Sequence, residues 1–467
     1  MREKLNQIVK RSTSDQARFH VIIAFFVIAF LTGGGSRGDI TSLVVLRPLA
    51  ILFCAYALSI ADPNELRTVR MPLFMLTAII AVIALQLVPL PPLVWQELPK
   101  RAIYGDIGDL MGIEQPWRPI NLSPSGGWNS LFSTTIPLAA LLLYAVQTAD
   151  NKRKILYIIL GAALCSGLIG LLQFASSSTD LFYFYRITNE GLPVGLFANR
   201  NHQALLFAIS IVIFGWWAHK LNPSSNHITT QSLIILFGII FSIVMIFILG
   251  SRAGLAASVF GIFVMLMFLY FSPLLSIGAK RGIRVFGYNM SLRAIVLSSS
   301  FAVIVGITLL VVLMSRSLAL DRLLQKVPVE TLRSKIFPAL IDMGGDFLPY
   351  GSGFGSFQRV FYQFETTELL RPQYLNHAHN DWIEFIIEGG VAAILTLAVF
   401  VIWFLVRCFQ ISKRPSGRTK SIGIAAISII LIFGFASIVD YPLRVPSFMA
   451  AFAVVCAMLE GSGRSKV

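Results

Sequence analysis

Twelve apolar runs dominate the chain, and each is close to the ~20 residues that an α-helix needs to cross a bilayer. They lie near residues 19–33, 41–60, 71–90, 129–147, 154–174, 202–219, 231–250, 253–272, 294–314, 382–406, 421–438 and 444–460. Hydrophobic residues make up 56% of the sequence and charged residues 13%, which excludes a set of soluble domains. We therefore expect an all-α polytopic membrane protein with about 12 transmembrane helices, forming a single integral membrane domain over residues 1–467.

The distribution of lysine and arginine predicts how the helices are threaded. With a cytoplasmic N-terminus, every inward connection is basic, near residues 2–18, 67–70, 152–154, 220, 280–293, 407–420 and 464–466. Cytoplasmic loops carry such an excess, so we expect both termini in the cytoplasm. The first apolar run is followed by GGGSRGD, without a small-residue cleavage pattern. This favours a retained helix over a signal peptide.

The outward segments are then 93–128, 175–201 and a long loop over 315–380, before the tenth predicted helix. The inward loops explain most of the net charge of +15. Further basic residues fall on the outward side, against the usual bias: Arg186, Arg200, Arg252, Arg316, Arg322, Lys326, Arg333, Lys335, Arg359 and Arg371. Guanidinium groups at this level favour an anionic partner, such as a phosphate or pyrophosphate carried on a lipid. We expect membrane lipids around the protein and no nucleic acid partner.

The stretch NHAHNDWIEFIIEGG, at 376–390, places polar groups at the mouth of a predicted helix. It contains His377, His379, Asn380, Asp381, Glu384 and Glu388. At 100° per residue the three carboxylates share one helix face. Asp381 and Glu384 have the spacing of a capping box, which predicts a helix start near Asp381 with His379 in irregular backbone before it. Such groups are costly at membrane level unless they have a function.

Three interpretations fit these residues. His377 and His379 could bind a metal together with a carboxylate, although a two-residue spacing is a weak metal signal. The polar groups could serve only to cap the helix. We favour the third interpretation, in which His379 is a general base for a sugar hydroxyl, because imidazole titrates near neutral pH.

Two arginines stand at other predicted helix ends. Arg252, in GSRAGLAA, has apolar residues on both sides and needs a partner. A carboxylate such as Glu388 could pair with it, but we favour an anion site. Arg200, in GLFANRNHQA, either reaches lipid head groups or meets a phosphate, and Asn199 or Asn201 could cap the helix beside it.

The segment LPYGSGFGSF, at 348–357, has glycines at alternating positions. It lacks the Gly-Lys-Ser/Thr of a nucleotide-binding P-loop. We interpret it as a tight turn that positions the long outward loop over the membrane.

Several of these pieces, in this order, resemble the O-antigen ligase and polysaccharide polymerase superfamily of bacterial inner-membrane glycosyltransferases. The resemblance covers roughly residues 150–450, the expected ligase-related core. It rests on SRAG around Arg252, an arginine ahead of the Gly-rich turn at Arg333, PYGSGFGSF, AHNDWIEFIIEGG and VDYPLRVPS at 439–447. The AHND and EGG piece is the most specific of them.

The resemblance implies a membrane glycosyltransferase fold of the C type in the inner membrane, with its active site facing the periplasm. The implied donor is a glycan on undecaprenyl pyrophosphate. His379 would be the catalytic base, and Arg252 and Arg333 would bind the pyrophosphate. The supporting residues would be Arg200, His377, Asn380, Asp381 and Glu388. Direct displacement would invert the anomeric centre, with no metal and no cofactor.

The acceptor is left open by the resemblance. Ligases use lipid A core, polymerases use another lipid-linked repeat, and some relatives use protein hydroxyls. We expect a ligase, with a polymerase of the same superfamily as the alternative. A transporter of lipid-linked sugars would use similar arginines, but related sequence halves typical of transporters are not visible.

Overall fold

The computed structural model describes residues 14–176, 182–221, 230–272, 283–285, 288–290, 329–370 and 374–463. The predicted helix at 294–314 lies outside these residues, as do parts of the expected loop at 315–380.

The described elements are almost all helical. In chain order they are α2 (Asp15–Thr32), α3 (Leu43–Ile60), α4 (Pro63–Arg67), α5 (Arg70–Gln86), β1 (Pro89–Leu90), α6 (Pro92–Trp95), α7 (Ala102–Leu110), β2 (Arg118–Pro119), α8 (Pro124–Ser133), α9 (Thr135–Ala145), α10 (Ala149–Ala175), α11 (Arg200–His219), α12 (Thr230–Leu249), α13 (Arg252–Tyr270), β3 (Ile283–Val285), β4 (Tyr288–Met290), α16 (Val329–Asp346), α17 (Phe357–Phe361), α18 (Asp381–Ser412), α19 (Arg418–Val439), the 3-10 helix η1 (Pro442–Arg444) and α20 (Pro446–Gly463). The strands form two short antiparallel pairs, β1 with β2 and β3 with β4.

Within the described residues, nine helices are long and apolar enough to cross a membrane: α2, α3, α10, α11, α12, α13, α18, α19 and α20. The polytopic all-α class is therefore confirmed, whereas the count of twelve stays a prediction. α5 is apolar but has only 17 residues. The run predicted as one helix at 129–147 is divided between α8 and α9, which meet at Thr134 in backbone that is still close to helical (φ −66°, ψ −17°).

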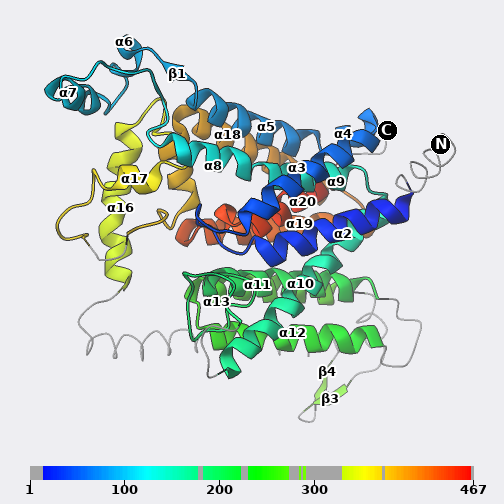
Figure 1. Ribbon diagram of the computed structural model, residues 1–467. Coiled ribbons are helices and arrows are strands. Elements are labelled where there is room, and N and C mark those ends of the chain that lie inside the picture. The colour runs from blue at the N-terminus through cyan, green and yellow to red at the C-terminus, as the bar shows by residue number, and fades with distance from the viewer. Residues whose placement is uncertain are drawn as a thin grey trace, which may run out of the picture.

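The helices form a bundle with two distinct ends (Figure 1). α10, α11, α12 and α13 lie together on one side of it, and the other long helices form the larger part. α6, α7, α16 and α17 gather at one end of the bundle, which we call the site end. α2 begins, and α20 finishes, at the opposite end.

Polar contacts tie several predicted inward connections together at this opposite end. Arg18 pairs with Glu65 at 3.1 Å, and Asn151 donates to the carbonyl of Asp15. Glu460 is fully buried and pairs with Arg407. The connections joined by these contacts therefore lie at the same end as the start of α2.

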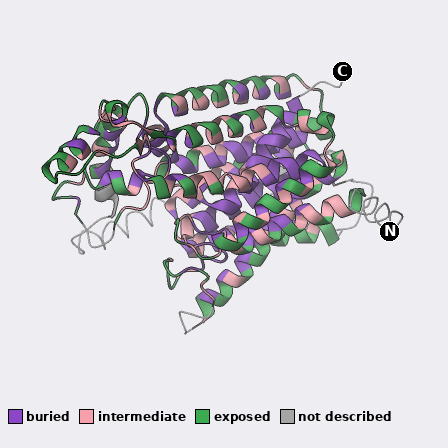
Figure 2. Cartoon of the chain, turned by 45° about the horizontal axis from the view of Figure 1, so that its top comes forward, coloured by how far each residue is buried: buried purple, intermediate pink, exposed green. Residues whose placement is uncertain are grey.

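α11 is the most buried of the nine long apolar helices, and buried residues gather in the middle of the bundle (Figure 2). It packs closely on α13 because small residues face each other there. A Cβ atom at Gly254 would lie only 2.3 Å from the Cβ of Ala204. The small residues of GSRAGLAA thus serve close helix packing, which fixes the starts of α11 and α13 side by side.

Candidate active site

The histidine stretch leads directly into α18 at the site end. The helix begins at Asp381, as its spacing predicts, but the N-cap is Asn380, whose Oδ1 accepts from the amide of Ile383 at 3.0 Å. The expectation that Asp381 caps the helix is wrong. Its Oδ2 is engaged elsewhere, because it accepts from Ser437 Oγ and from the amide of Leu443.

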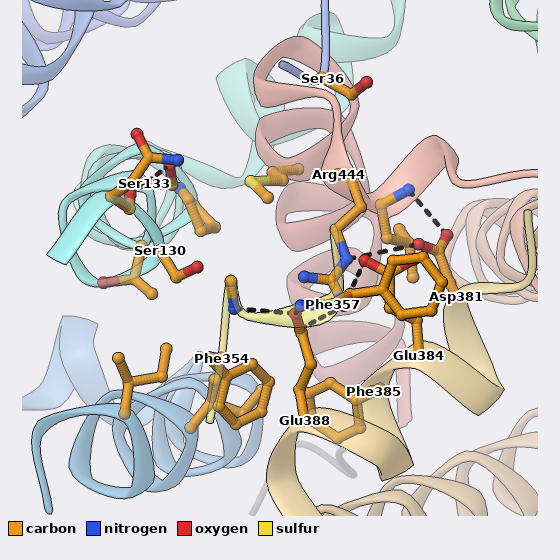
Figure 3. A pocket seen from close by; sticks show the side chains of 18 of the residues that line it. Ser36, Ser130, Ser133, Phe354, Phe357, Asp381, Glu384, Phe385, Glu388 and Arg444 are labelled. Atoms are coloured by element: carbon orange, nitrogen blue, oxygen red, sulfur yellow. Dashed lines mark hydrogen bonds and ion pairs between the residues drawn. The ribbon is translucent and has the colours of Figure 1, made fainter. Parts of the chain in front are cut away.

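Arg444 is the partner of the acidic face of α18 (Figure 3). Its Nη2 lies 2.9 Å from Glu388 Oε2 and 3.4 Å from Glu384 Oε1, and its Nε lies 3.8 Å from Asp381 Oδ1. All three carboxylates are buried. They raise the pKa of Arg444 above its usual value, against the opposing effect of burial. The idea that Glu388 pairs with Arg252 is therefore wrong, and the partner comes from η1 instead.

The Gly-rich segment at 348–357 is a turn that docks on α18. Glu388 Oε1 accepts from the amides of Gly355 at 2.8 Å and Phe357 at 3.2 Å, and its carbonyl accepts from the amide of Gly353. α18 is kinked at Gly390, whose φ of 59° leaves room for the turn, since a Cβ there would lie 2.2 Å from the carbonyl oxygen of Pro349. The turn thus reaches α18 through backbone contacts that only glycine permits.

Two segments far apart in the sequence hold this turn from the other side. Gln86 Nε2 donates to the carbonyls of Tyr350 and Glu388, and Asn121 Nδ2 donates to that of Phe354. The buried Arg101 donates to the carbonyl of Gly351 at 3.1 Å, and burial lowers its pKa to about 10. The expected role of 348–357 as a positioning turn fits these contacts.

Three imidazoles surround the ring of Tyr441, which follows α19. The ring centroids of His377, His379 and His202 lie 4.6, 5.0 and 5.4 Å from that of Tyr441. His379 has a positive φ of 53°, rare outside glycine, and its Nδ1 lies 3.0 Å from the carbonyl oxygen of His377. Because a carbonyl only accepts, Nδ1 carries the proton, and the lone pair of the neutral ring is on Nε2.

His377 contacts acceptors through both ring nitrogens. Nδ1 lies 2.8 Å from Glu384 Oε1, and Nε2 lies 3.5 Å from the carbonyl oxygen of Ser36. Burial lowers the pKa of His377, but the Glu384 carboxylate outweighs it, so the net pKa is raised above the ordinary value. His377 therefore forms an ion pair with Glu384 below its raised pKa.

This pairing predicts a pH dependence of folding stability. Because the folded-state pKa lies above the ordinary value of about 6.5, the pair stabilises fully below that pH and its contribution is lost as pH rises through the raised pKa. We expect wild type to melt at a higher temperature than His377→Gln in acidic buffer, with the gap closing in alkaline buffer. Melting of the two purified proteins across pH measures this. A gap that widens with pH would contradict the ion pair.

Arg252 is one of the two arginines predicted to bind the pyrophosphate, and the structure describes its position. Arg252 opens α13 and is half-buried, and its neighbour Ser251 Oγ donates to Asn201 Oδ1 at 2.8 Å. Asn201 precedes His202, which contacts the ring of Tyr441. This chain of contacts brings the start of α13 to the site end, beside the histidines.

Arg200 is the first residue of α11 and is half-buried. Asn199 caps the helix, as one of the two predicted alternatives, by accepting from the amide of Asn201. Arg333 belongs to α16, but its side chain lies outside the described part of the chain. Its contact with a pyrophosphate stays a prediction.

A cavity of about 740 Å³ opens beside the Arg444 cluster, between α5, α8, α9, α18 and α20. Its polar end includes His377, Asp381, Glu384, Glu388 and Arg444, and its deep end is apolar, with Met75, Ile79, Leu141, Leu397, Phe400 and Phe452. His379, Asn380, Arg200 and Arg252 do not line it. The two described arginines are therefore not part of the cavity lining.

Among the described residues, no group of three or more His, Cys, Asp or Glu side chains is arranged to hold a metal ion. His377 is instead engaged with Glu384.

Sequence reasoning missed Arg444 as a site residue, although VDYPLRVPS had been singled out. The sequence did contain a hint, because Arg444 and the three acidic residues of 381–388 are all predicted at the outward ends of spans. His202 and Asp440 were also missed. Their side chains are buried, with His202 Nε2 3.9 Å from Asp440 Oδ2.

The family comparison falls on the elements that build this site. A family model described as O-Antigen ligase matches residues 237–398. That range holds α13 with Arg252, α16, the Gly-rich turn, the histidines and the acidic face of α18. No curated protein matches the chain. Over these central residues, the match supports the resemblance to the O-antigen ligase and polymerase superfamily of glycosyltransferase-type membrane enzymes.

Proposed function

We propose that this protein transfers a glycan from undecaprenyl pyrophosphate to an acceptor hydroxyl at the periplasmic face of the bacterial inner membrane. The observation that carries the proposal is the geometry of His379. Its Nδ1–H donates to the carbonyl of His377, which leaves Nε2 as the basic nitrogen of a neutral ring that lies 5.0 Å from the ring of Tyr441. A general base needs this fixed tautomer.

The chemistry requires one bond to form and one to break at the anomeric carbon. The acceptor oxygen attacks this carbon while its proton passes to His379 Nε2. The bond from the carbon to the pyrophosphate oxygen breaks, and undecaprenyl pyrophosphate leaves with the electron pair. This direct displacement inverts the anomeric centre. Guanidinium groups can neutralise the charge that develops on the leaving group. We assign this role to Arg252 and Arg333, so the leaving group needs no metal.

Arg252→Lys tests the phosphate contact. A lysine keeps the charge but loses the planar, bidentate grip, so we expect kcat/KM to fall about 10- to 100-fold, as for the loss of a charged hydrogen bond. Transfer by purified protein from an undecaprenyl-pyrophosphate-linked glycan measures this. Arg153→Lys, at the opposite end of the bundle, is the matched control. Turnover close to wild type in Arg252→Lys would assign Arg252 a structural role instead.

The overall function is tested by the surface glycans of a deletion strain, complemented with wild type or His379→Ala. In the deletion strain and in the strain that carries His379→Ala, we expect lipid A core without attached glycan together with accumulated lipid-linked polymer. This is the result for a ligase, and wild type should restore the attached glycan. Core that carries a single repeat, or lost exopolysaccharide with unchanged lipopolysaccharide, would assign the polymerase role of the same superfamily. Unchanged glycans of every kind would overturn both.

A further inference from the structure

The helix α8 turns its polar face inward, toward the cavity. Gly126, Asn129, Ser130 and Ser133 follow one another at helical spacing and all line the cavity. On the other side of α8, Trp128 and Phe132 stack on each other and are exposed. In a membrane protein the apolar face meets lipid, so a polar stripe that faces inward marks a wet, functional surface.

Some hydrogen-bonding groups of this polar face have partners within the protein, and others do not. Arg47 Nη2 donates to Asn129 Oδ1 at 2.6 Å and to Ser133 Oγ at 2.9 Å, which fixes both side chains. Among the described residues, the Asn129 Nδ2 amide and the Ser130 hydroxyl have no hydrogen-bond partner. Figure 3 shows Ser130 and Ser133 across the cavity from Arg444 and Glu388. A ligand between them would meet polar groups on both sides.

The balance of charge in the cavity opposes an anion. Four carboxylates line it, from Asp39, Asp381, Glu384 and Glu388, against the guanidinium groups of Arg359 and Arg444 and the imidazole of His377, which is cationic below its raised pKa. Arg444 is already engaged with three of those carboxylates. A pyrophosphate would therefore be repelled here, whereas hydroxyl groups would donate to the carboxylates.

Aromatic rings complete the polar end of the cavity. Phe354, Phe357 and Phe385 lie next to Glu388 (Figure 3), and the rings of Phe354 and Phe385 are 5.2 Å apart. The C–H face of a pyranose packs on such rings while its hydroxyls reach amides, hydroxyls and carboxylates. The deep end of the cavity is apolar, so a sugar would stay at the polar end.

We propose that this polar end binds the terminal sugar of the acceptor, read by Asn129 and Ser130 of α8, and that this sugar is uncharged. The inference rests on the proposed function, and it separates the acceptor from the pyrophosphate of the donor, which we assign to Arg252, outside the cavity lining, and to Arg333. His377 lines the cavity, and its ring and the ring of His379 both contact Tyr441, at 4.6 and 5.0 Å between centroids. The polar end is therefore the part of the cavity nearest the proposed base.

A binding experiment tests the subsite without any turnover. The full-length Ser130→Cys protein in lipid nanodiscs is alkylated with N-ethylmaleimide, and the modified peptide is quantified by mass spectrometry. The probes are dodecyl glucoside and dodecyl glucuronide, which share a tail and differ in one carboxylate. We expect the glucoside to slow alkylation at position 130 and the glucuronide to be about tenfold less effective or worse.

Asp106→Cys is the matched control for this labelling, because Asp106 is exposed on α7 and does not line the cavity. Its alkylation should be insensitive to both probes. Equal protection by glucoside and glucuronide at position 130 would overturn the uncharged-sugar assignment. No protection by either probe, or equal protection at position 106, would overturn the subsite.

A kinetic experiment separates this inference from the proposed function. With an undecaprenyl-pyrophosphate-linked donor and an acceptor that wild type uses, Ser130→Leu and Asn129→Leu should raise the acceptor KM about tenfold and leave the donor KM unchanged. Phe132→Leu, on the outer face of the same helix, should change neither. An unchanged acceptor KM in both variants would sink the subsite alone. Absence of transfer by wild type to any acceptor would sink the proposed function, while the alkylation result would still decide the sugar site.

Discussion

His379→Ala should lower glycan transfer about 10²- to 10⁴-fold, the usual contribution of a general base, while the amount of protein in the membrane stays the same. The physical reason is that Nε2 is the nitrogen with the lone pair, since Nδ1–H donates to the carbonyl of His377. No other group of His379 would accept the proton of the attacking hydroxyl. The measurement is transfer by purified protein from an undecaprenyl-pyrophosphate-linked donor.

The backbone conformation of His379 suggests a second variant. His379 has φ of 53°, which asparagine adopts more readily than most residues. His379→Asn therefore keeps the loop and removes only the base, so it should be as inactive as His379→Ala. His219→Ala, at the far end of α11, is the control and should retain activity. Transfer within tenfold of wild type by either His379 variant would exclude His379 as the base.

The parts of the site that follow from local spacing were predictable from the sequence. Asp381, Glu384 and Glu388 are three and four residues apart, so their common face follows from the helical repeat alone. The start of α18 and the turn at 348–357 follow in the same way from capping and glycine patterns. Asn380 took the cap because Asp381 has stronger partners from α19 and η1.

The parts that depend on distant segments were not predictable. Arg444 lies 56 positions after Glu388, and no periodicity connects them. Gln86 and Asn121 hold the Gly-rich turn from a still more distant part of the chain. Likewise, the first residues of the predicted span at 129–147 belong to α8, whose polar stripe lines the cavity. A hydropathy window averages the polar and apolar faces of a helix, so it does not reveal such a stripe.

Arg444→Met should strongly destabilise the protein. The substitution leaves Asp381, Glu384 and Glu388 buried without their common cation, and removal of one partner of a buried ion pair costs about 3–5 kcal/mol. Methionine fills a similar volume, so the loss reports charge more than packing. The measurement is the melting temperature in detergent together with the amount of folded protein in the membrane. Arg418→Met, at an exposed arginine of the opposite end, should melt like wild type.

A second substitution distinguishes charge compensation from a general defect of folding. Adding Glu388→Gln to Arg444→Met removes one of the unpaired charges, so the double variant should be more stable than Arg444→Met alone. Arg444→Lys keeps a cation but not the fork that spans three carboxylates, so its stability should fall between wild type and Arg444→Met. If Arg444→Met melts at the wild-type temperature, the carboxylates are neutral in the folded protein. The charge that excludes a pyrophosphate from the cavity would then be missing too, and the uncharged-acceptor assignment would lose its electrostatic support.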